Sequence, residues 1–393
     1  MSVPYTRLFR VDGRWRWWRP LVALAFLAGW YVVTQILITV AYFVPIGATQ
    51  GAQGLMDLEQ SLTSGALDPT DPLVLSLSLV SLVVLLPGIL FAVKIARLGP
   101  ANTLSSVRFR VRWGWAAWCV LPTLVIAVAS FILQTGLFSS DGMFTFDGGF
   151  GWNHAAIGQS TVTLGTLTLT IAMVVVLVPF QGAAEEYVFR GFLMQWIGSW
   201  IPARIVGSVV AVVVSTVVFA LLHIPNGYNV WGILDVGSFG LVAAIIVIRT
   251  GGLEATVLQH AFNNIMIFVL QAPGWSKVSL DSSNSTWGSW LFSLGSSLAY
   301  WGMVEALAHW RKLDRRFPGS EAPRFRGPVP VWAGGKRWTR PGGATWSGAP
   351  ARSEGVAGST ATVGSDGTVG SDAAVGSAAS GPVDNAIGVP GRP

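Results

Sequence analysis

Eight apolar stretches, each long enough to cross a lipid bilayer, dominate the sequence and leave few folds open to it. A transmembrane helix needs about 20 apolar residues. Because lipid offers the backbone no hydrogen-bond partner, a continuous apolar segment of this length has to be helical. We therefore predict an all-α polytopic transmembrane bundle of about eight spans, at residues 21–44, 73–93, 115–137, 163–184, 205–223, 230–249, 253–271 and 288–310.

The composition agrees with a membrane protein. Only 11% of the 393 residues are charged, whereas a soluble domain carries about 25%. The net charge of +6 does not indicate a nucleic-acid partner, because membrane proteins concentrate Lys and Arg in cytoplasmic loops. Cys119 is the single cysteine, which excludes an intramolecular disulfide and a thiolate metal cluster.

The charges between the apolar stretches alternate in sign along the chain. Basic residues precede the first stretch and follow the second, fourth, sixth and eighth, whereas acidic residues follow the first and third. Short loops rich in Lys and Arg face the cytoplasm. We expect a multi-pass protein of the cell membrane, in contact with lipid, with both termini in the cytoplasm.

The chain divides into parts of different composition. From about residue 317 it is rich in Gly, Ala, Ser and Pro and contains a six-residue repeat beginning at Val363. Such a segment cannot bury a core, so we expect a disordered cytoplasmic tail acting as a linker or a tether. The expected parts are an Arg- and Trp-rich cytoplasmic segment at 1–20, N-terminal transmembrane helices and loops at 21–160, a core rich in polar side chains at 161–275, a last helix with a basic flank at 276–316, and the tail at 317–393.

Three charges interrupt or end the apolar stretch that precedes residue 191. Glu185, Glu186 and Arg190 follow the run LTLTIAMVVVLVPF, although a charge in hydrocarbon costs roughly 3 kcal/mol or more on insertion scales. Residues four apart share a helix face, so Glu186 and Arg190 can form an ion pair. Glu185 then points about 100° away and stays free.

Two histidines lie within or at the ends of apolar stretches. His223 is four residues after Phe219, and His260 is four residues before Asn264, so each pair shares a helix face. His154 and His309 are assigned no chemical role.

Counting residues indicates the depth of these groups. Pro202 predicts a turn, and Glu185 precedes it by about 17 residues whereas His223 follows it by about 21. An antiparallel hairpin thus brings the two to a similar height. His260 lies at the same depth in the membrane as Glu185 and His223 only if the hairpin at 187–204 projects into the cytoplasm.

A structural interpretation competes with a functional one. A Glu–Arg pair can lock two helices together, and intramembrane histidines can make polar contacts between helices. The polar groups nevertheless fall within about 80 residues of apolar chain. Because each is costly in lipid, their clustering favours a shared, hydrated functional site.

The segments EEYVFRG, FALLH and HAFNN carry a family resemblance. They resemble the EExxxR, FxxxH and HxxxN motifs of the CAAX-protease and bacteriocin-processing (CPBP, or Abi) family of intramembrane proteases, which includes the type II CAAX prenyl endopeptidase. The resemblance covers about 110 residues, from Leu164 to about Ala272, with no departure at the motif positions.

The resemblance implies hydrolysis of peptide bonds within the membrane by six site residues, Glu185, Glu186, Arg190, His223, His260 and Asn264. Glu185 and His223 would hold and activate the attacking water. His260 and Asn264 would stabilise the tetrahedral oxyanion, and the remaining two would order the site. A partly desolvated carboxylate is a suitable base near neutrality.

The involvement of a metal stays open at this stage. Glu185, His223 and His260 could bind zinc and leave one position for water, and members of the family are often labelled metalloproteases. A glutamate-activated water needs no metal, and the sequence contains no HExxH. We favour the metal-free mechanism, with zinc as the possible cofactor.

Other functions would use the same polar groups. A proton-coupled transporter would also place Glu, Arg and His in a membrane cavity, although it would usually show related halves. A catalytically idle scaffold or immunity protein would retain the fold alone. For a protease, the expected partners are membrane-associated or lipid-modified peptides and proteins, including prenylated C-termini, leader peptides, bacteriocin precursors and membrane-protein termini.

Overall fold

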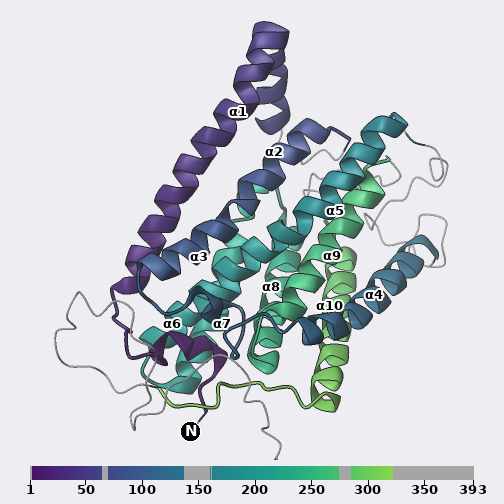
Figure 1. Ribbon diagram of the computed structural model, residues 1–393. Coiled ribbons are helices and arrows are strands. Elements are labelled where there is room, and N and C mark those ends of the chain that lie inside the picture. The colour runs from purple at the N-terminus through teal and green to yellow at the C-terminus, as the bar shows by residue number, and fades with distance from the viewer. Residues whose placement is uncertain (1, 64–69, 137–159, 161, 274–284, 322–393) are drawn as a thin grey trace, which may run out of the picture. The chain divides into compact units, whose positions relative to one another are not determined.

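The computed structural model describes residues 2–63, 70–136, 160, 162–273 and 285–321 (Figure 1). The chain divides into two units, Met1–Trp346 and Ser347–Pro393, and the second lies wholly outside the described residues. Within the described ranges all regular structure is helical apart from two isolated β-bridges, Val3–Phe317 and Ser106–Gly252. The predicted all-α class is therefore confirmed.

A helix overlaps each of the eight predicted stretches. The helices are α1 (Arg19–Thr63), α2 (Pro72–Val83), α3 (Leu85–Ile95), α4 (Trp113–Gly136), α5 (Leu164–Glu186), α6 (Met194–Trp200), α7 (Arg204–Leu221), α8 (Val230–Thr250), α9 (Glu254–Gln271) and α10 (Trp287–Trp310). Side-chain caps fix several starts: Asp71 accepts hydrogen bonds from backbone N–H groups at the start of α2, and Thr163 and Asn229 do the same for α5 and α8.

Among the described residues, six helical segments are long and apolar enough to cross a membrane, where about eight were expected. They are Arg19–Leu62, Pro72–Ile95, Trp113–Leu133, Leu164–Trp200, Arg204–Leu221 and Val230–Thr250. The remaining two stretches form α9 and α10, whose sequences carry Glu, Gln, His and Asn in one case and many Ser, Gly and Trp residues in the other. These polar and interfacial side chains lower the mean hydropathy without preventing helix formation.

The first helix runs further than the sequence indicated. We expected it to end near residue 44, but α1 extends to Thr63 with a break at Gly51, where φ is +68°. Glycine adopts this backbone region without the steric cost of a side chain. The acidic residues Asp57 and Glu59, assigned to a loop, therefore lie in the helical segment that follows the break.

A long continuous helix carries the charged motif. α5 passes without interruption into a π-helical segment, Tyr187–Leu193, and then into α6. Short π-helical segments occur frequently at functional sites. The predicted turn at Pro202 is confirmed, since α6 ends at Trp200 and α7 begins at Arg204.

Helices α5 and α9 lie side by side in the centre of the bundle (Figure 1). Gly182 makes this approach possible, because a Cβ atom there would meet the backbone nitrogen of Ala261 at 3.3 Å. α7 packs against α8, and α8 packs against α10. The five helices that carry the motif residues or surround them are thus held together by close packing.

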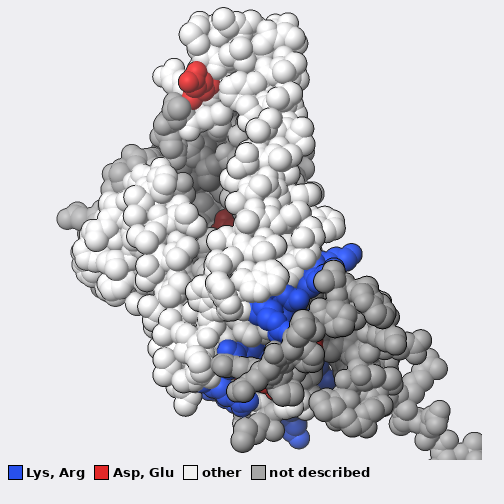
Figure 2. Space-filling view, turned by 90° about the vertical axis from the view of Figure 1, so that its left-hand side faces the viewer, with Lys and Arg blue, Asp and Glu red and all other residues white. Residues whose placement is uncertain are grey.

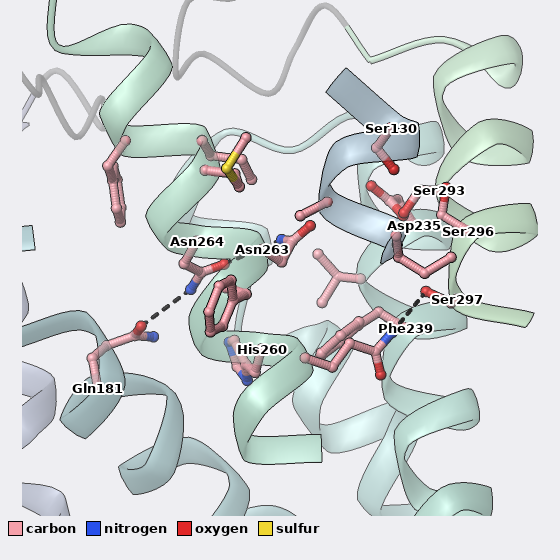
Figure 3. Close-up of a pocket in the computed structure, with 18 of the residues that line it drawn as sticks. Ser130, Gln181, Asp235, Phe239, His260, Asn263, Asn264, Ser293, Ser296 and Ser297 are labelled. Atoms are coloured by element: carbon pink, nitrogen blue, oxygen red, sulfur yellow. Dashed lines mark hydrogen bonds between the residues drawn. The ribbon is translucent and has the colours of Figure 1, made fainter. Parts of the chain in front are cut away.

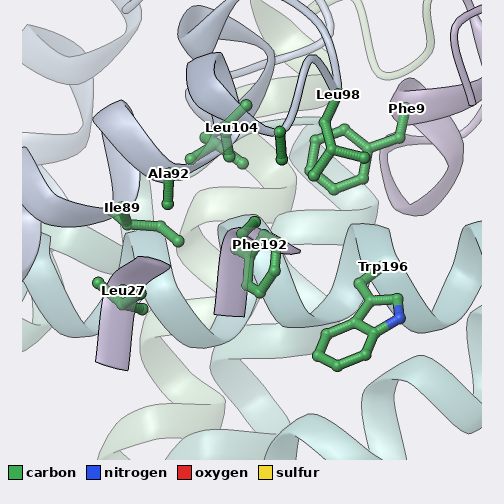
Figure 4. Close-up of a cluster of buried hydrophobic side chains, with 11 residues drawn as sticks. Phe9, Leu27, Ile89, Ala92, Leu98, Leu104, Phe192 and Trp196 are labelled. Atoms are coloured by element: carbon green, nitrogen blue, oxygen red, sulfur yellow. The ribbon is translucent and has the colours of Figure 1, made fainter. Parts of the chain in front are cut away.

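One hydrophobic cluster fixes the end of the bundle where α5 continues into α6. Phe192 and Trp196, from the π-helical segment and α6, pack against α1, α3 and the N-terminal 3-10 helix Tyr5–Arg10 (Figure 4). The cluster includes Phe9, Leu27, Ile89, Ala92, Leu98 and Leu104. Its burial anchors the chain immediately after the charged motif.

The start of the predicted tail is ordered against the N-terminal segment. The backbone N–H of Phe317 donates to the carbonyl of Val3 over 2.9 Å, and the ring of Phe317 stacks on Phe109 with centroids 5.1 Å apart. Glu321 lies 2.7 Å from Arg7. Residues 317–321 of the predicted tail thus pack against the N-terminal segment, and the rest of the predicted tail falls outside the described residues.

The charged side chains separate along the molecule. Figure 2 shows Lys and Arg gathered at one end of this face and an acidic patch near the other. This separation agrees with the alternation of charge read from the loops, whereas the orientation of the chain in a membrane stays a prediction.

Candidate active site

Four helical elements bring the six predicted site residues together. Glu185, Glu186 and Arg190 come from the end of α5 and the π-helical segment, His223 follows α7, and α9 contributes His260 and Asn264. A cavity of about 430 Å³ opens beside them, lined among others by Glu185, His223, His260 and Asn264. Glu186 and Arg190 lie behind its wall.

Glu186 and Arg190 form the ion pair that their spacing predicts. Nη1 of Arg190 lies 3.0 Å from Oε1 of Glu186, and both side chains are 0% exposed. The guanidinium also rests over the ring of Phe219, with its carbon 4.1 Å from the centroid. Gly240 leaves room for it, because a Cβ there would lie 2.9 Å from Nη2 of Arg190. The ion pair is therefore buried, and neither side chain is accessible to a substrate.

His260 connects this pair to the cavity. Its Nδ1 lies 3.1 Å from Oε1 of Glu186, and its Nε2 lies 3.6 Å from Oε2 of Glu185. The rings of Phe219 and Phe239 flank it, with centroids 6.3 Å and 5.1 Å away. The contact of Nδ1 with Glu186 leaves Nε2 as the ring nitrogen that can act in the cavity.

The carboxylate of Glu185 has one oxygen held and one oxygen without a hydrogen bond among the described residues. Oε1 accepts a hydrogen bond of 2.6 Å from Nε2 of Gln181. Oε2 is buried and makes no hydrogen bond to any described residue. Glu185 therefore stays outside the Glu186–Arg190 ion pair and keeps one oxygen for chemistry.

Gln181 is a site residue that sequence reasoning missed. Besides donating to Glu185, it accepts a hydrogen bond of 3.1 Å from Nδ2 of Asn264, as the dashed line in Figure 3 shows. A signal was present, because Gln181 is four residues before Glu185 and such residues share a helix face. The amide was overlooked because it carries no charge.

His223 lies just beyond the end of α7, within a short turn. Its Nδ1 is 2.8 Å from the backbone carbonyl of Phe219, and the two rings lie 4.7 Å apart. Nδ1 can donate to this carbonyl as the N–H tautomer, which leaves Nε2 as an acceptor toward the cavity. Of the histidines given no role, His309 lies at the end of α10, and His154 falls outside the described residues.

The residues proposed for zinc do not form a metal centre in this arrangement. Within the described part of the chain, no group of three or more His, Cys, Asp or Glu side chains is placed to hold a metal ion. No catalytic step is therefore derived through a metal.

Comparison with known proteins agrees with this constellation. Residues 167–266 match the family described as type II CAAX prenyl endopeptidase Rce1-like. The chain carries an Rce1-like domain. This domain spans all six predicted residues and Gln181, and it coincides with the segment on which the CPBP resemblance rests.

One relative extends the similarity beyond the Rce1-like domain. The chain is 26% identical over 265 residues to the uncharacterized protein YyaK of Bacillus subtilis (strain 168), covering 65% of this chain and 79% of that protein. No solved structure matches the chain.

Proposed function

We propose that this protein is an intramembrane endopeptidase that hydrolyses peptide bonds through a water molecule activated by Glu185. The observation that carries the proposal is the placement of Oε2 of Glu185: it makes no hydrogen bond to the described residues and lies 3.6 Å from Nε2 of His260 beside a cavity. An oriented carboxylate next to an imidazole, within apolar helices, suits general-base catalysis.

In the proposed reaction, Glu185 and His223 hold a water molecule by hydrogen bonds. Glu185 takes one proton as the water oxygen attacks the scissile carbonyl, which forms a tetrahedral oxyanion. The oxyanion then collapses, the C–N bond breaks, and the proton held by Glu185 passes to the departing amine. Glu185 returns to its starting state, so protons and charge balance over the cycle.

The oxyanion needs donors placed where negative charge develops. Nε2 of His260 can donate when both ring nitrogens carry a proton, while Nδ1 donates to Glu186. Asn264 uses one amide hydrogen toward Gln181 and retains a second. Donors fixed in a poorly hydrated site stabilise the transition state more than they would in water.

Glu186, Arg190 and Gln181 act in this proposal by positioning the reacting groups. Glu186 holds His260, Arg190 balances the charge of Glu186, and Gln181 joins Glu185 to Asn264. None of the three has to contact the scissile bond.

The substrates proposed are membrane-associated or lipid-modified peptides and proteins. The match to the Rce1-like family supports a peptide substrate, and the placement of the cavity among membrane-spanning helices supports a substrate that enters from, or lies at, the bilayer.

A comparison of protein termini in cells tests the proposal and requires no purified substrate. Membrane proteins would be compared between a deletion strain carrying the wild-type chain and the same strain carrying Glu185→Ala at equal abundance. New termini that appear only with the wild type support a peptidase. Identical termini in both strains would favour a transporter or a catalytically idle scaffold.

A further inference from the structure

The cavity continues past the catalytic residues into a second end lined by polar side chains. Figure 3 shows most of these side chains on the side of the cavity away from Gln181, and all but Asn263 come from helices that the catalytic motifs do not use. They comprise Ser130 of α4, Asp235 of α8, Asn263 of α9, and Ser293, Ser296 and Ser297 of α10. The proposed hydrolysis assigns no role to these residues.

Asp235 lies within reach of the site along α8. It precedes Phe239 by four residues, and the ring of Phe239 lies 5.1 Å from that of His260. One helical turn, roughly 6 Å along the axis, thus separates Asp235 from a residue in contact with the catalytic imidazole. Asp235 and His260 therefore line the same cavity, joined through one wall residue.

No Lys or Arg pairs with the carboxylate of Asp235 in the part of the chain that the structure describes. Ser293 is its hydrogen-bond partner, and Oδ1 is buried without one. Among the described residues that line the cavity there is no Lys or Arg. The buried carboxylates of Glu186 and Glu254, by contrast, pair with Arg190 and Arg112 at 3.0 Å and 2.7 Å. Asp235 is partly buried, and an ionisable side chain without a charge partner within membrane helices indicates a functional role.

Further acceptors at this end suit a group with several hydrogen-bond donors. Oε1 of Gln259 is buried and makes no hydrogen bond within the described chain, while its amide nitrogen lies 3.4 Å from Oγ of Ser297. An ammonium carries three N–H donors and a guanidinium five, and neither offers an acceptor. A cation therefore satisfies both the charge of Asp235 and the neighbouring oxygens.

We propose that Asp235 and the serines of α10 form a subsite that binds a Lys or Arg side chain of the peptide substrate next to the scissile bond. The identification of the bound group as a substrate side chain rests on the proposed peptidase function. The binding of a cation at Asp235 does not depend on that function. A neutral apolar side chain would leave the carboxylate unpaired, and an acidic one would be repelled.

A binding experiment tests the subsite without any cleavage. The full chain in lipid nanodiscs would be titrated with hexylammonium and, separately, with 1-hexanol, using ligand-observed NMR. We expect hexylammonium to bind wild type at least about tenfold more tightly than Asp235→Asn, as for the loss of a charge-assisted hydrogen bond. Hexanol should bind both alike.

Two further variants guard against misfolding and against general charge effects. Asp235→Glu keeps the charge and should retain the preference for hexylammonium. Asp57→Asn removes an exposed carboxylate from α1 and should behave as wild type. Equal hexylammonium affinity in wild type and Asp235→Asn, or no preference of the wild type for the cation over the alcohol, would overturn the proposal.

A peptide experiment separates this inference from the proposed function. Matched peptides that carry lysine or norleucine at each of the three positions on either side of the cleaved bond would be compared by kcat/KM. The lysine-to-norleucine ratio should reach about ten at one position in wild type and fall close to one in Asp235→Asn. Cation binding without cleavage of any peptide would contradict the peptidase and leave the cation site standing. Cleavage without a preference for lysine would overturn the substrate subsite alone.

Discussion

Gln181 and Glu185 lie one helical turn apart on α5, and Nε2 of Gln181 donates to Oε1 of Glu185 over 2.6 Å. The same amide accepts from Asn264 over 3.1 Å. A neutral side chain thus links the proposed base to a proposed oxyanion donor on another helix. Because both links depend on one amide, its removal should disturb both ends of the site.

Replacing Gln181 by methionine should lower kcat by about tenfold or more, because methionine keeps the length of the side chain and removes both hydrogen bonds. KM should change by less than about threefold, since Gln181 positions the reacting groups and does not have to hold the substrate. Steady-state kinetics in proteoliposomes measures the two constants separately. A variant with the kcat of wild type would show that Glu185 needs no such support.

Removing one member of the Glu186–Arg190 pair should destabilise the fold far more than removing one member of an exposed pair. Glu186→Ala or Arg190→Ala alone should lower the free energy of unfolding by about 3–5 kcal/mol, because each leaves one buried charge unpaired. The double variant should lose less than the sum of the two single losses. Reversible unfolding in mixed micelles measures these differences.

The chain contains a matched control for this cycle. Arg249 and Glu305 join α8 to α10 at 2.5 Å, with side chains 50% and 27% exposed. Exposed pairs contribute about 0–1 kcal/mol, so Arg249→Ala should cost little. Equal losses at the two pairs would contradict the interpretation that the Glu186–Arg190 pair is shielded from water.

Two truncations should separate the ordered start of the C-terminal region from the rest. Ending the chain after Arg324 keeps the contacts of Phe317 and Glu321 and should leave the melting temperature unchanged, because the segment removed is poor in large apolar residues. Ending it after Arg316 removes both contacts and should lower the melting temperature by several degrees. Thermal unfolding followed by intrinsic tryptophan fluorescence compares the two. A shorter chain as stable as the longer one would show that these contacts contribute nothing.

Asp12 should make the protein less stable as the pH rises. Burial raises the pKa of this carboxyl from 3.8 to about 6, although the backbone N–H and the charge of Arg14 act in the opposite direction. The folded state therefore binds a proton between these pH values that the unfolded chain has released, so stability falls as pH rises through this window. At pH 7 the loss is on the order of 2–3 kcal/mol.

The variant Asp12→Asn should remove this dependence. It should be more stable than wild type at pH 7 and equal to it near pH 4, as measured by unfolding at a series of pH values. The same difference between the two proteins at both pH values would show that Asp12 does not titrate in this range.

Much of this arrangement could be predicted from sequence because its causes are local. Apolar length determines where helices form, and the four-residue spacing of Glu186 and Arg190 determines that they can pair. The same geometry separates Glu185 from Glu186. These inferences do not depend on how the helices pack.

The features that were missed depend on contacts between distant segments. Phe317 follows a polar stretch in the sequence, and its order comes from Val3 and Phe109, more than 200 residues away. Gln181 gained its role from Asn264 of α9. Of the about eight spans expected, six described helical segments reach the hydropathy of a membrane span, and polar side chains keep α9 and α10 below it.

The central claim is that Glu185 is the base, and Glu185→Gln tests it most directly because it keeps the shape of the side chain and removes the charge. Purified wild type, Glu185→Gln and a matched control, Glu59→Gln on the exposed part of α1, would be reconstituted at equal density. Their turnover would be compared on one peptide that the wild type cleaves. We expect Glu185→Gln to unfold at the wild-type temperature and to lose about 10²–10⁴-fold in kcat, with Glu59→Gln unchanged. A folded Glu185→Gln protein that keeps more than about a tenth of wild-type turnover would contradict the account.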